Sequence, residues 1–333
     1  MSDQPNEVRC VQPGESGVFV LERFWGRVRR RYLRWLRSGY VARMAKLRRG
    51  DCPDCPHDIV DARDLKLYRN VCGFWFPPEA DAFAWRDRLP FARMGLAEVV
   101  VLGGGGFLVA LGLLFIAPLL AILPAAFGIF ICWFFRDPHR EIPTDPQLLL
   151  SPCDGRVDDI VEVERCVLGV PAIRIGVSLS LFNVHLNRAP IRGRVFEVRY
   201  SRGIFKNAMR RGDHSQNEQL WTVFEPAAQG TPRVAVRQIA GPVARRIVCE
   251  VRPGQEVAQG ERFGMIKFGS RTELYLPQDA GFELLVRAGD RVKGGLSRLA
   301  RVPSSDASGV DRGEAGDGQI HGLAQPVLGV GPR

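Results

Sequence analysis

The chain has 333 residues, of which 46% are apolar and 25% are charged, which is enough for one substantial globular core and additional segments. Its formal net charge of +10 excludes a strongly acidic protein and indicates an anionic partner, either nucleic acid or a phospholipid surface. The eight cysteines are spread along the chain and the first residues do not resemble a secretory signal peptide, so the sequence indicates a reducing compartment.

Residues 1–95 are predicted to be a basic extension in which the positive charge is concentrated. Residues 24–50 include ten Lys or Arg residues and no acidic residue. Apolar residues recur among them at helical spacing, namely Trp25, Val28, Tyr32, Trp35 and Leu36. This pattern predicts an amphipathic helix over 24–50 that lies in a membrane interface. A solvated helix or a nucleic-acid contact is the alternative, but no nucleic-acid reading motif accompanies the arginines, so we expect no nucleic-acid partner.

A short segment with three cysteines follows this helix. Cys52, Cys55, His57 and Cys72 include one C-x2-C pair, which is a common beginning of a tetrahedral zinc site. There is no second C-x2-C pair, and a histidine two residues after a cysteine is cramped for joining it on one ion. The spacing therefore favours an ordinary proline-rich turn with reduced thiols, and zinc is the less favoured alternative.

The next segment, residues 96–136, contains 37 consecutive residues without a charge, Val99 to Phe135. One straight helix of this length would measure roughly 55 Å, whereas the hydrocarbon core of a bilayer is about 30 Å thick. We therefore expect a membrane-inserted hairpin of two short helices joined near Pro118 to Pro124. Arginines flank both ends, which predicts a membrane-associated protein with its catalytic domain on the cytoplasmic face.

From residue 137 to residue 295, short β-branched and apolar runs alternate with glycine and proline. This pattern predicts a mainly β (α+β) catalytic domain. Two stretches in it, EVRPGQEVAQGERFGMIKFGS and ELLVRAGDRVKGG, contain V-x-x-G-x-x-V turns and look like a biotinyl or lipoyl type barrel. The remaining residues, 296–333, hold seven glycines and little aromatic content, so we expect a disordered tail.

Three segments of the β domain carry residues suited to nucleophile, base and acid chemistry: SPCDG (151–155), FNVHLNRAP (182–190) and ERFGMIKFGSRTELYLP (261–277). Ser270 follows Gly269, which has no side chain to obstruct attack on its own carbonyl. His185 is suited to take a hydroxyl proton, and Asp154 to orient the histidine. Each residue also has a structural interpretation, as a hairpin, a core histidine or a turn, and spacing alone does not show that the three meet.

Together with FFRDPHREIP (134–143), these segments resemble the short bacterial and archaeal type of phosphatidylserine decarboxylase proenzyme over roughly residues 134–294. The resemblance implies a self-cleaving carboxy-lyase that converts phosphatidylserine to phosphatidylethanolamine and CO2. Cleavage between Gly269 and Ser270 would give a large chain (1–269) and a small chain (270–333) that begins with a covalent pyruvoyl group. His185, oriented by Asp154, would activate the Ser270 hydroxyl, and the pyruvoyl carbonyl would act as the electron sink for decarboxylation.

Two positions depart from the family pattern. A second histidine of the longer branch corresponds here to Phe182, so a single histidine is assigned, and Cys153 replaces the usual alanine before Asp154. We interpret Cys153 as a small buried hydrophobe. Three further residues near the predicted site, Asn187, Arg188 and Arg271, are candidates to hold the substrate carboxylate or phosphate, with structural pairing as the alternative.

Two other functions compete with this interpretation. The barrel-like turns would also suit a non-enzymatic, membrane-anchored carrier or adaptor module, but Lys267 lies inside an apolar run rather than on an exposed hairpin. A pyruvoyl decarboxylase of a soluble amino acid would need neither the apolar run nor the basic helix. The expected partners are a phospholipid membrane and the two chains of one precursor, and the sequence leaves a homo-oligomer open.

Overall fold

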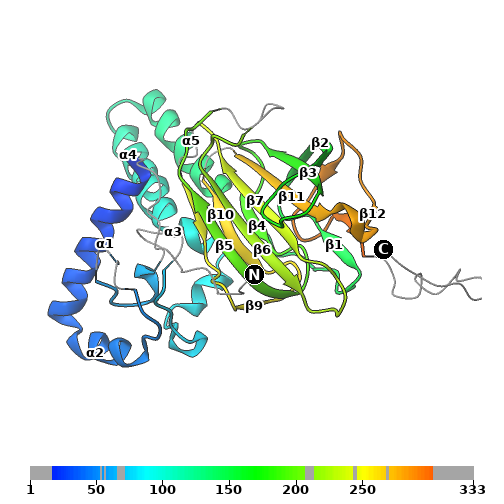
Figure 1. Ribbon diagram of the computed structural model, residues 1–333. Coiled ribbons are helices and arrows are strands. Elements are labelled where there is room, and N and C mark those ends of the chain that lie inside the picture. Colours follow the sequence, from blue (N-terminus) through cyan, green and yellow to red (C-terminus); the bar gives the residue numbers. More distant parts are fainter. Residues whose placement is uncertain are drawn as a thin grey trace, which may run out of the picture. The chain divides into compact units, whose positions relative to one another are not determined.

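The structure is a computed structural model (Figure 1) that describes residues 17–52, 55, 58–65, 72–206, 214–242, 246–267 and 270–302. These residues belong to one structural unit, Met1–Pro303. The predicted tail lies outside the described residues from 303 onward. Its first residues differ from the prediction, because Arg298–Arg301 form strand β14, which pairs with β1 (Leu148–Leu150).

The basic segment forms two helices, α1 (Gly17–Leu36) and α2 (Ser38–Leu47), rather than one. Arg37, between them, has φ −137° and ψ 41°, which ends the regular helix before Ser38. On one face of α1 the side chain of Trp35 is 84% exposed. On another face Arg30 donates to the buried Asp64 over 3.0 Å, and Arg29 also donates to it. Part of the positive charge of the extension is therefore held in ion pairs within it, whereas aromatic side chains remain at the surface.

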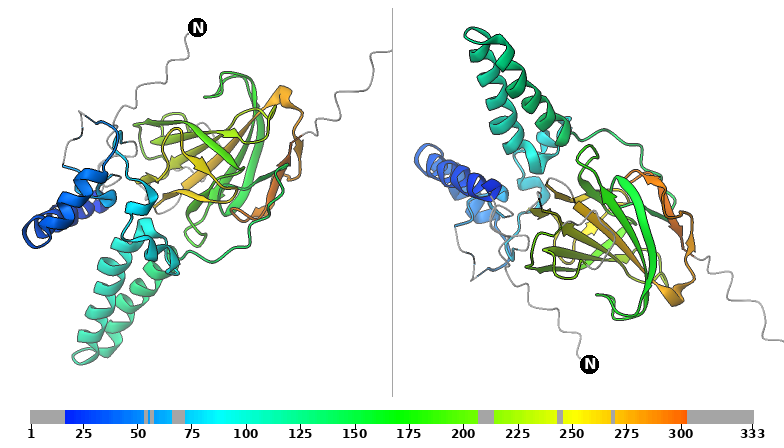
Figure 2. Two further views of the ribbon diagram at one scale, coloured as in Figure 1. Left: turned by 90° about the horizontal axis from the view of Figure 1, so that it is seen from below. Right: turned by 90° about the horizontal axis from the view of Figure 1, so that it is seen from above.

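Short helical turns lead from this extension to the apolar segment: η1 (Ala62–Asp64), η2 (Pro78–Ala80), η3 (Ala84–Arg88), η4 (Arg93–Gly95), α3 (Leu96–Glu98) and the π-helical turn η5 (Val99–Gly103). The apolar segment itself forms α4 (Gly104–Leu114) and α5 (Pro118–Phe134), which lie side by side in both views of Figure 2. The helical stretch Arg93–Leu114 has 22 residues and is long and apolar enough to cross a membrane.

The join between the two apolar helices lies next to Pro118, at the start of the region that the sequence suggested. It falls at residues 115–117, because Pro118 begins α5 and Pro124 lies inside that helix. Proline is tolerated at the first helical position, where its missing N–H would be unpaired in any case. A Cβ on Gly106 would lie 2.9 Å from the Pro124 carbonyl oxygen, and one on Gly128 would lie 3.0 Å from that of Gly103. Glycines thus allow the two backbones to approach closely.

The rest of the chain is β-rich, as predicted, and is organised by a curled eight-stranded antiparallel sheet with the order β13-β2-β3-β11-β7-β6-β5-β9. Its strands are β2 (Gly155–Val163), β3 (Ala172–Leu179), β5 (Gly193–Ser201), β6 (Gln219–Pro226), β7 (Val234–Ala240), β9 (Glu256–Val257), β11 (Ser270–Pro277) and β13 (Arg291–Val292). Strand β11 lies in the interior of this order, paired with β3 on one side and β7 on the other.

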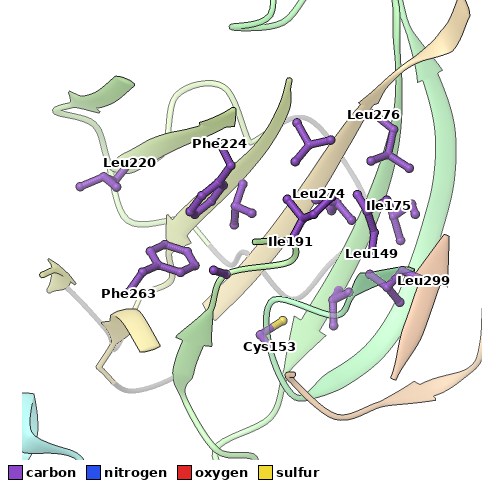
Figure 3. Close-up of a cluster of buried hydrophobic side chains, with 14 of the residues drawn as sticks. Leu149, Cys153, Ile175, Ile191, Leu220, Phe224, Phe263, Leu274, Leu276 and Leu299 are labelled. Atoms are coloured by element: carbon purple, nitrogen blue, oxygen red, sulfur yellow. The ribbon is translucent and has the colours of Figure 1, made fainter. Parts of the chain in front are cut away.

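Two three-stranded sheets complete the domain. One has the order β1-β14-β12, with β12 at Glu283–Leu284, and the other has the order β4-β10-β8. The strands of the second are β4 (Leu186–Arg188), β8 (Ile247–Cys249) and β10 (Arg262–Ile266). Buried side chains from all three sheets form one core, shown in Figure 3. Cys153 is fully buried in this core, where burial raises the pKa of its thiol, as expected for a packing residue.

Candidate active site

Ser270 is the first residue of β11, and its backbone is held from both sides. It pairs with Leu179 of β3 and with Ala240 of β7. The preceding strand, β10, ends at Ile266. Gly269 lies outside the described residues. The bond between Gly269 and Ser270 therefore comes after the end of β10 and at the beginning of β11, which belong to different sheets.

His185 lies beside the end of β10, the strand that precedes Ser270 in the chain. It precedes β4, and its carbonyl oxygen accepts a hydrogen bond of 3.3 Å from the N–H of Ile266, the last residue of β10. Strands β4 and β10 are hydrogen-bonded neighbours. The histidine is therefore held next to Ile266, which precedes Ser270 by four residues in the sequence. The structure therefore attaches His185 to the strand that precedes Ser270 in the chain.

The environment of His185 makes its imidazole a neutral base. The residue is completely buried, and burial lowers the pKa of the ring to about 4. Its Nδ1 lies 2.9 Å from the carbonyl oxygen of Asn183. Since a carbonyl oxygen can only accept, Nδ1 carries the proton in this hydrogen bond and Nε2 carries the lone pair. At neutral pH the ring is therefore in the form that can receive a hydroxyl proton at Nε2.

Asp154 has different partners from those the sequence suggested. Its two carboxylate oxygens accept hydrogen bonds of 2.6 and 2.9 Å from Arg140, and one of them also accepts 2.8 Å from the N–H of Gly294. The described contacts therefore give the orienting position on Nδ1 to the Asn183 carbonyl. The charge of Asp154 still acts on His185, since it opposes part of the fall in the histidine pKa.

The end of helix α5 forms one wall of the site. The ring of Phe134 lies with its centroid 4.3 Å from that of His185. Phe134 belongs to a buried cluster with Val184 and Leu186, which flank the histidine, and with Met265 of β10. The end of α5 is thus packed directly on the residues that flank His185.

Lys267, the last described residue before Ser270, is also tied to the apolar segment. Its ammonium donates to the carboxylate of Glu98 at the end of α3, and both residues are almost completely buried. A buried ion pair of this kind fixes the end of the segment that leads to Ser270. One signal for this pair is present in the sequence, a single acid immediately before a run without charges.

The three residues proposed as substrate ligands lie in buried networks. Asn187 donates to Thr272 over 3.1 Å, and Arg188 donates to Asp137 over 3.1 Å. The guanidinium of Arg271 pairs with Asp158, Asp159 and Glu273 at 2.6 to 2.8 Å. Arg271 is fully buried. These contacts correspond to the structural pairing that the sequence left open.

The cysteine segment behaves differently from the ordinary turn that the spacing favoured. A disulfide joins Cys52 and Cys55, and the sulfur of Cys72 lies 3.6 Å from that of Cys55. His57 lies outside the described residues. The structure thus brings three of the four residues of the zinc alternative together, far along the chain from the β domain.

Comparison with known proteins assigns the β domain to a family. A family model described as phosphatidylserine decarboxylase matches residues 127–300. A phosphatidylserine decarboxylase proenzyme from Rhodopirellula baltica is 42% identical over 241 residues, which cover 71% of this chain and 98% of the relative. Those of Carboxydothermus hydrogenoformans and Anaplasma phagocytophilum are 42% and 38% identical, covering 60% and 66% of this chain and 94% and 92% of the relatives.

These matches show the class of protein, because they cover more than half of the chain: it is a carboxy-lyase made as a proenzyme. It belongs to the phosphatidylserine decarboxylase family.

Proposed function

We propose that this chain cuts itself between Gly269 and Ser270 and then decarboxylates phosphatidylserine to phosphatidylethanolamine and CO2 at a membrane surface. Membership in the decarboxylase family carries the reaction. The position of Ser270 at the first residue of an interior strand, beside the strand that holds His185, supports the cleavage position.

The chain's own residues supply what the cleavage needs. Nε2 of His185 takes the proton of the Ser270 hydroxyl, which attacks the Gly269 carbonyl carbon and moves the acyl group from nitrogen to oxygen. The Asn183 carbonyl keeps the ring in the required tautomer. Asp154, held by Arg140 and Gly294, stabilises the positive charge that the ring gains during this transfer. Ester elimination then separates the two chains.

The architecture fits a covalent pyruvoyl group at position 270. Proenzymes of this family carry such a group, and its carbonyl supplies an electron sink for the carbanion left when CO2 departs. After cleavage, β11 stays paired with β3 and β7 over most of its length, so residue 270 remains fixed at the end of a strand. His185 remains beside it and can return a proton to the product. Asn187, Arg188 and Arg271 hold these strands in position.

We assign membrane contact to two parts of the chain. The pair α4 and α5 inserts into the bilayer as a hairpin, an assignment supported by side chains such as Leu119 and Leu123 that are 81% and 71% exposed. Helices α1 and α2 lie in the interface on the cytoplasmic face, where Trp35 contacts lipid. The domains proposed are residues 1–95, 96–136, 137–295 and the tail 296–333, with β14 attached to the third.

Part of the β domain is, in this proposal, a barrel of the biotinyl or lipoyl type. Two turns support it: Gly254 and Gly260 lie six residues apart with φ of 83° and 72°, and Gly289 and Gly295 repeat the spacing with 104° and 74°. Left-handed glycines at matched positions indicate two copies of one turn.

The test is the fate of the full-length chain. We expect the parent to appear on a denaturing gel as two fragments, with the small one bearing a pyruvoyl mass at residue 270. Ser270→Ala should remain a single inactive chain of 37.1 kDa, because no hydroxyl is left to attack Gly269. His185→Ala should also remain uncut, whereas Ser201→Ala at the end of β5 should cut normally.

Cleavage in the Ser270→Ala protein would refute the assigned position. A parent that stays intact would favour the carrier or adaptor alternative. Release of CO2 from free serine but not from phosphatidylserine vesicles would favour the soluble amino acid.

A further inference from the structure

Three cysteine sulfurs meet in the basic extension, away from the decarboxylase residues. The Sγ of Cys72 lies 3.6 Å from Cys55 Sγ and 4.0 Å from Cys52 Sγ. Cys52 and Cys72 are buried. The disulfide between Cys52 and Cys55 uses two of the three sulfurs. It does not explain why a third sulfur, from a segment 17 residues away, is held close to both.

The two edges of the triangle that start at Cys72 have the lengths found in a thiolate metal site, and the third edge is the Cys52–Cys55 disulfide bond. Zinc binds cysteine sulfur at about 2.3 Å in tetrahedral geometry, which places neighbouring sulfurs about 3.8 Å apart. The two distances from Cys72, 3.6 and 4.0 Å, lie on either side of this value. Cys52 and Cys55 also have the C-x2-C spacing, with the N–H of Cys55 donating to the Cys52 carbonyl over 3.1 Å.

Backbone hydrogen bonds hold the two cysteine-bearing segments together independently of the sulfurs. Arg49 and Trp75 exchange two hydrogen bonds of 2.9 Å each. Between them, a Cβ on Gly73 would lie only 1.9 Å from the carbonyl oxygen of Asp51. The Cys52 and Cys72 side chains therefore start from a prearranged frame, which lowers the entropy that a bound ion must overcome.

The basic extension has too small a core to be stable without a cross-link such as a disulfide or a bound metal. Among its described residues up to 91, the buried apolar side chains are few: Leu33, Met44, Cys52, Ile59, Val60 and Cys72. A core of this size does not stabilise a fold of its own, and small protein modules commonly add a disulfide or a structural metal.

We propose that, in the reduced protein, Cys52, Cys55 and Cys72 bind one Zn²⁺ as thiolates and that this structural site holds the basic extension on the catalytic domain. Opening the disulfide takes two electrons and two protons from a dithiol, which itself becomes a disulfide. Binding of Zn²⁺ then releases the three thiol protons. The guanidinium of Arg252, in the loop between β8 and β9, lies 4.2 Å from the ring of Trp75, so the site is connected to the catalytic domain.

The experiment measures metal in the full-length protein. The chain is purified in detergent with dithiothreitol, loaded with Zn²⁺, washed with a weak chelator and assayed for zinc by mass spectrometry. We expect about one ion per chain, and a loss of roughly tenfold or more in Cys72→Ser and Cys55→Ser, since even outer contacts of a zinc site change affinity about 10- to 100-fold. Cys166→Ser, at a half-buried thiol between β2 and β3, is the matched control and should keep the ion.

A second variant guards against misfolding. Cys72→His can still supply a ligand and should retain zinc where Cys72→Ser does not. Removal of zinc should also make residues 17–91 more sensitive to a protease while the catalytic domain keeps its melting temperature. The proposal is overturned if the reduced parent holds no zinc, if Cys72→Ser holds as much as the parent, or if protein isolated from cells under alkylation carries the Cys52–Cys55 disulfide.

Discussion

His185 shows how the interior of the β domain sets the chemistry of a single side chain. Complete burial lowers its pKa to about 4, although the Asn183 carbonyl and the charge of Asp154 act in the opposite direction. The ring therefore stays neutral at every pH at which the protein is expected to work. An exposed histidine near pKa 6.5 would lose part of its basic form already at mildly acidic pH.

This pKa leads to a prediction about pH. In the uncut Ser270→Ala precursor, His185 remains neutral when folded but protonates when unfolded, so stability should fall as pH decreases from about 6.5 toward 4. The full effect is about 3 kcal/mol. We would follow the urea midpoint between pH 7 and pH 4.5 with and without His185→Asn. If both proteins lose stability equally, the assignment of His185 as a buried neutral histidine is wrong.

A second prediction concerns Asp154. Asp154→Asn removes the charge that faces Arg140 and acts on His185, so we expect both slower self-cleavage and a less stable precursor. Breaking a buried pair costs about 3 to 5 kcal/mol. Cleavage time courses and melts of Asp154→Asn, Arg140→Met and the double variant separate the effects: the double variant should recover stability but not the cleavage rate. Recovery of both would make Asp154 a purely structural partner of Arg140.

At the scale of elements, the helices of the apolar segment contact the residues around the proposed cleavage position and hold them in place. Phe134 at the end of α5 covers His185, and Glu98 at the end of α3 pairs with Lys267. Both contacts join the proposed membrane segment to the strands that carry the reacting groups. Substrate drawn from the bilayer would therefore arrive beside His185.

The pair of Glu98 and Lys267 is testable by itself. Glu98→Gln leaves a buried ammonium without its charged partner and should destabilise the precursor by about 3 to 5 kcal/mol, with slower cleavage. Adding Lys267→Met should restore much of the stability. Glu79→Gln, at an exposed acid in η2, is the control. An unchanged melting temperature for Glu98→Gln would show that the pair does not fix the strand.

The elements also show what the sequence could and could not predict. Alternation of apolar runs and glycines was sufficient for the β domain, and the motif around Ser270 marked the beginning of β11. The partner of Asp154 could not be found, because Arg140 is close to it in space through a turn that spacing does not reveal. The sequence named Cys52, Cys55 and Cys72 only as a less favoured zinc alternative, because separations of 3 and 17 residues do not show that the three sulfurs share one frame. Pro124 does not mark the join, since α5 continues through it.

For the whole molecule, we predict two independent attachments to a membrane. Deleting residues 24–50 should weaken binding to anionic vesicles and remove most of its salt dependence, because arginine contacts with phosphate are screened as salt rises. The protein should nevertheless stay with the vesicles, since burial of α4 and α5 in hydrocarbon is not screened. Flotation at low and high salt measures both effects. Release of the full-length protein by salt alone would mean that α4 and α5 do not insert.

The placement of β11 has a consequence for the life of the molecule. The proposed cut between Gly269 and Ser270 would place an interior strand of the main sheet on a separate polypeptide of 64 residues, paired with the strands of the large chain. Unfolding then becomes a dissociation, so recovery depends on concentration and on two chains meeting again. The connection that guided β11 into place during folding no longer exists. If the proposed cut is made, we expect the mature protein to be preserved by slow unfolding rather than by its ability to fold again.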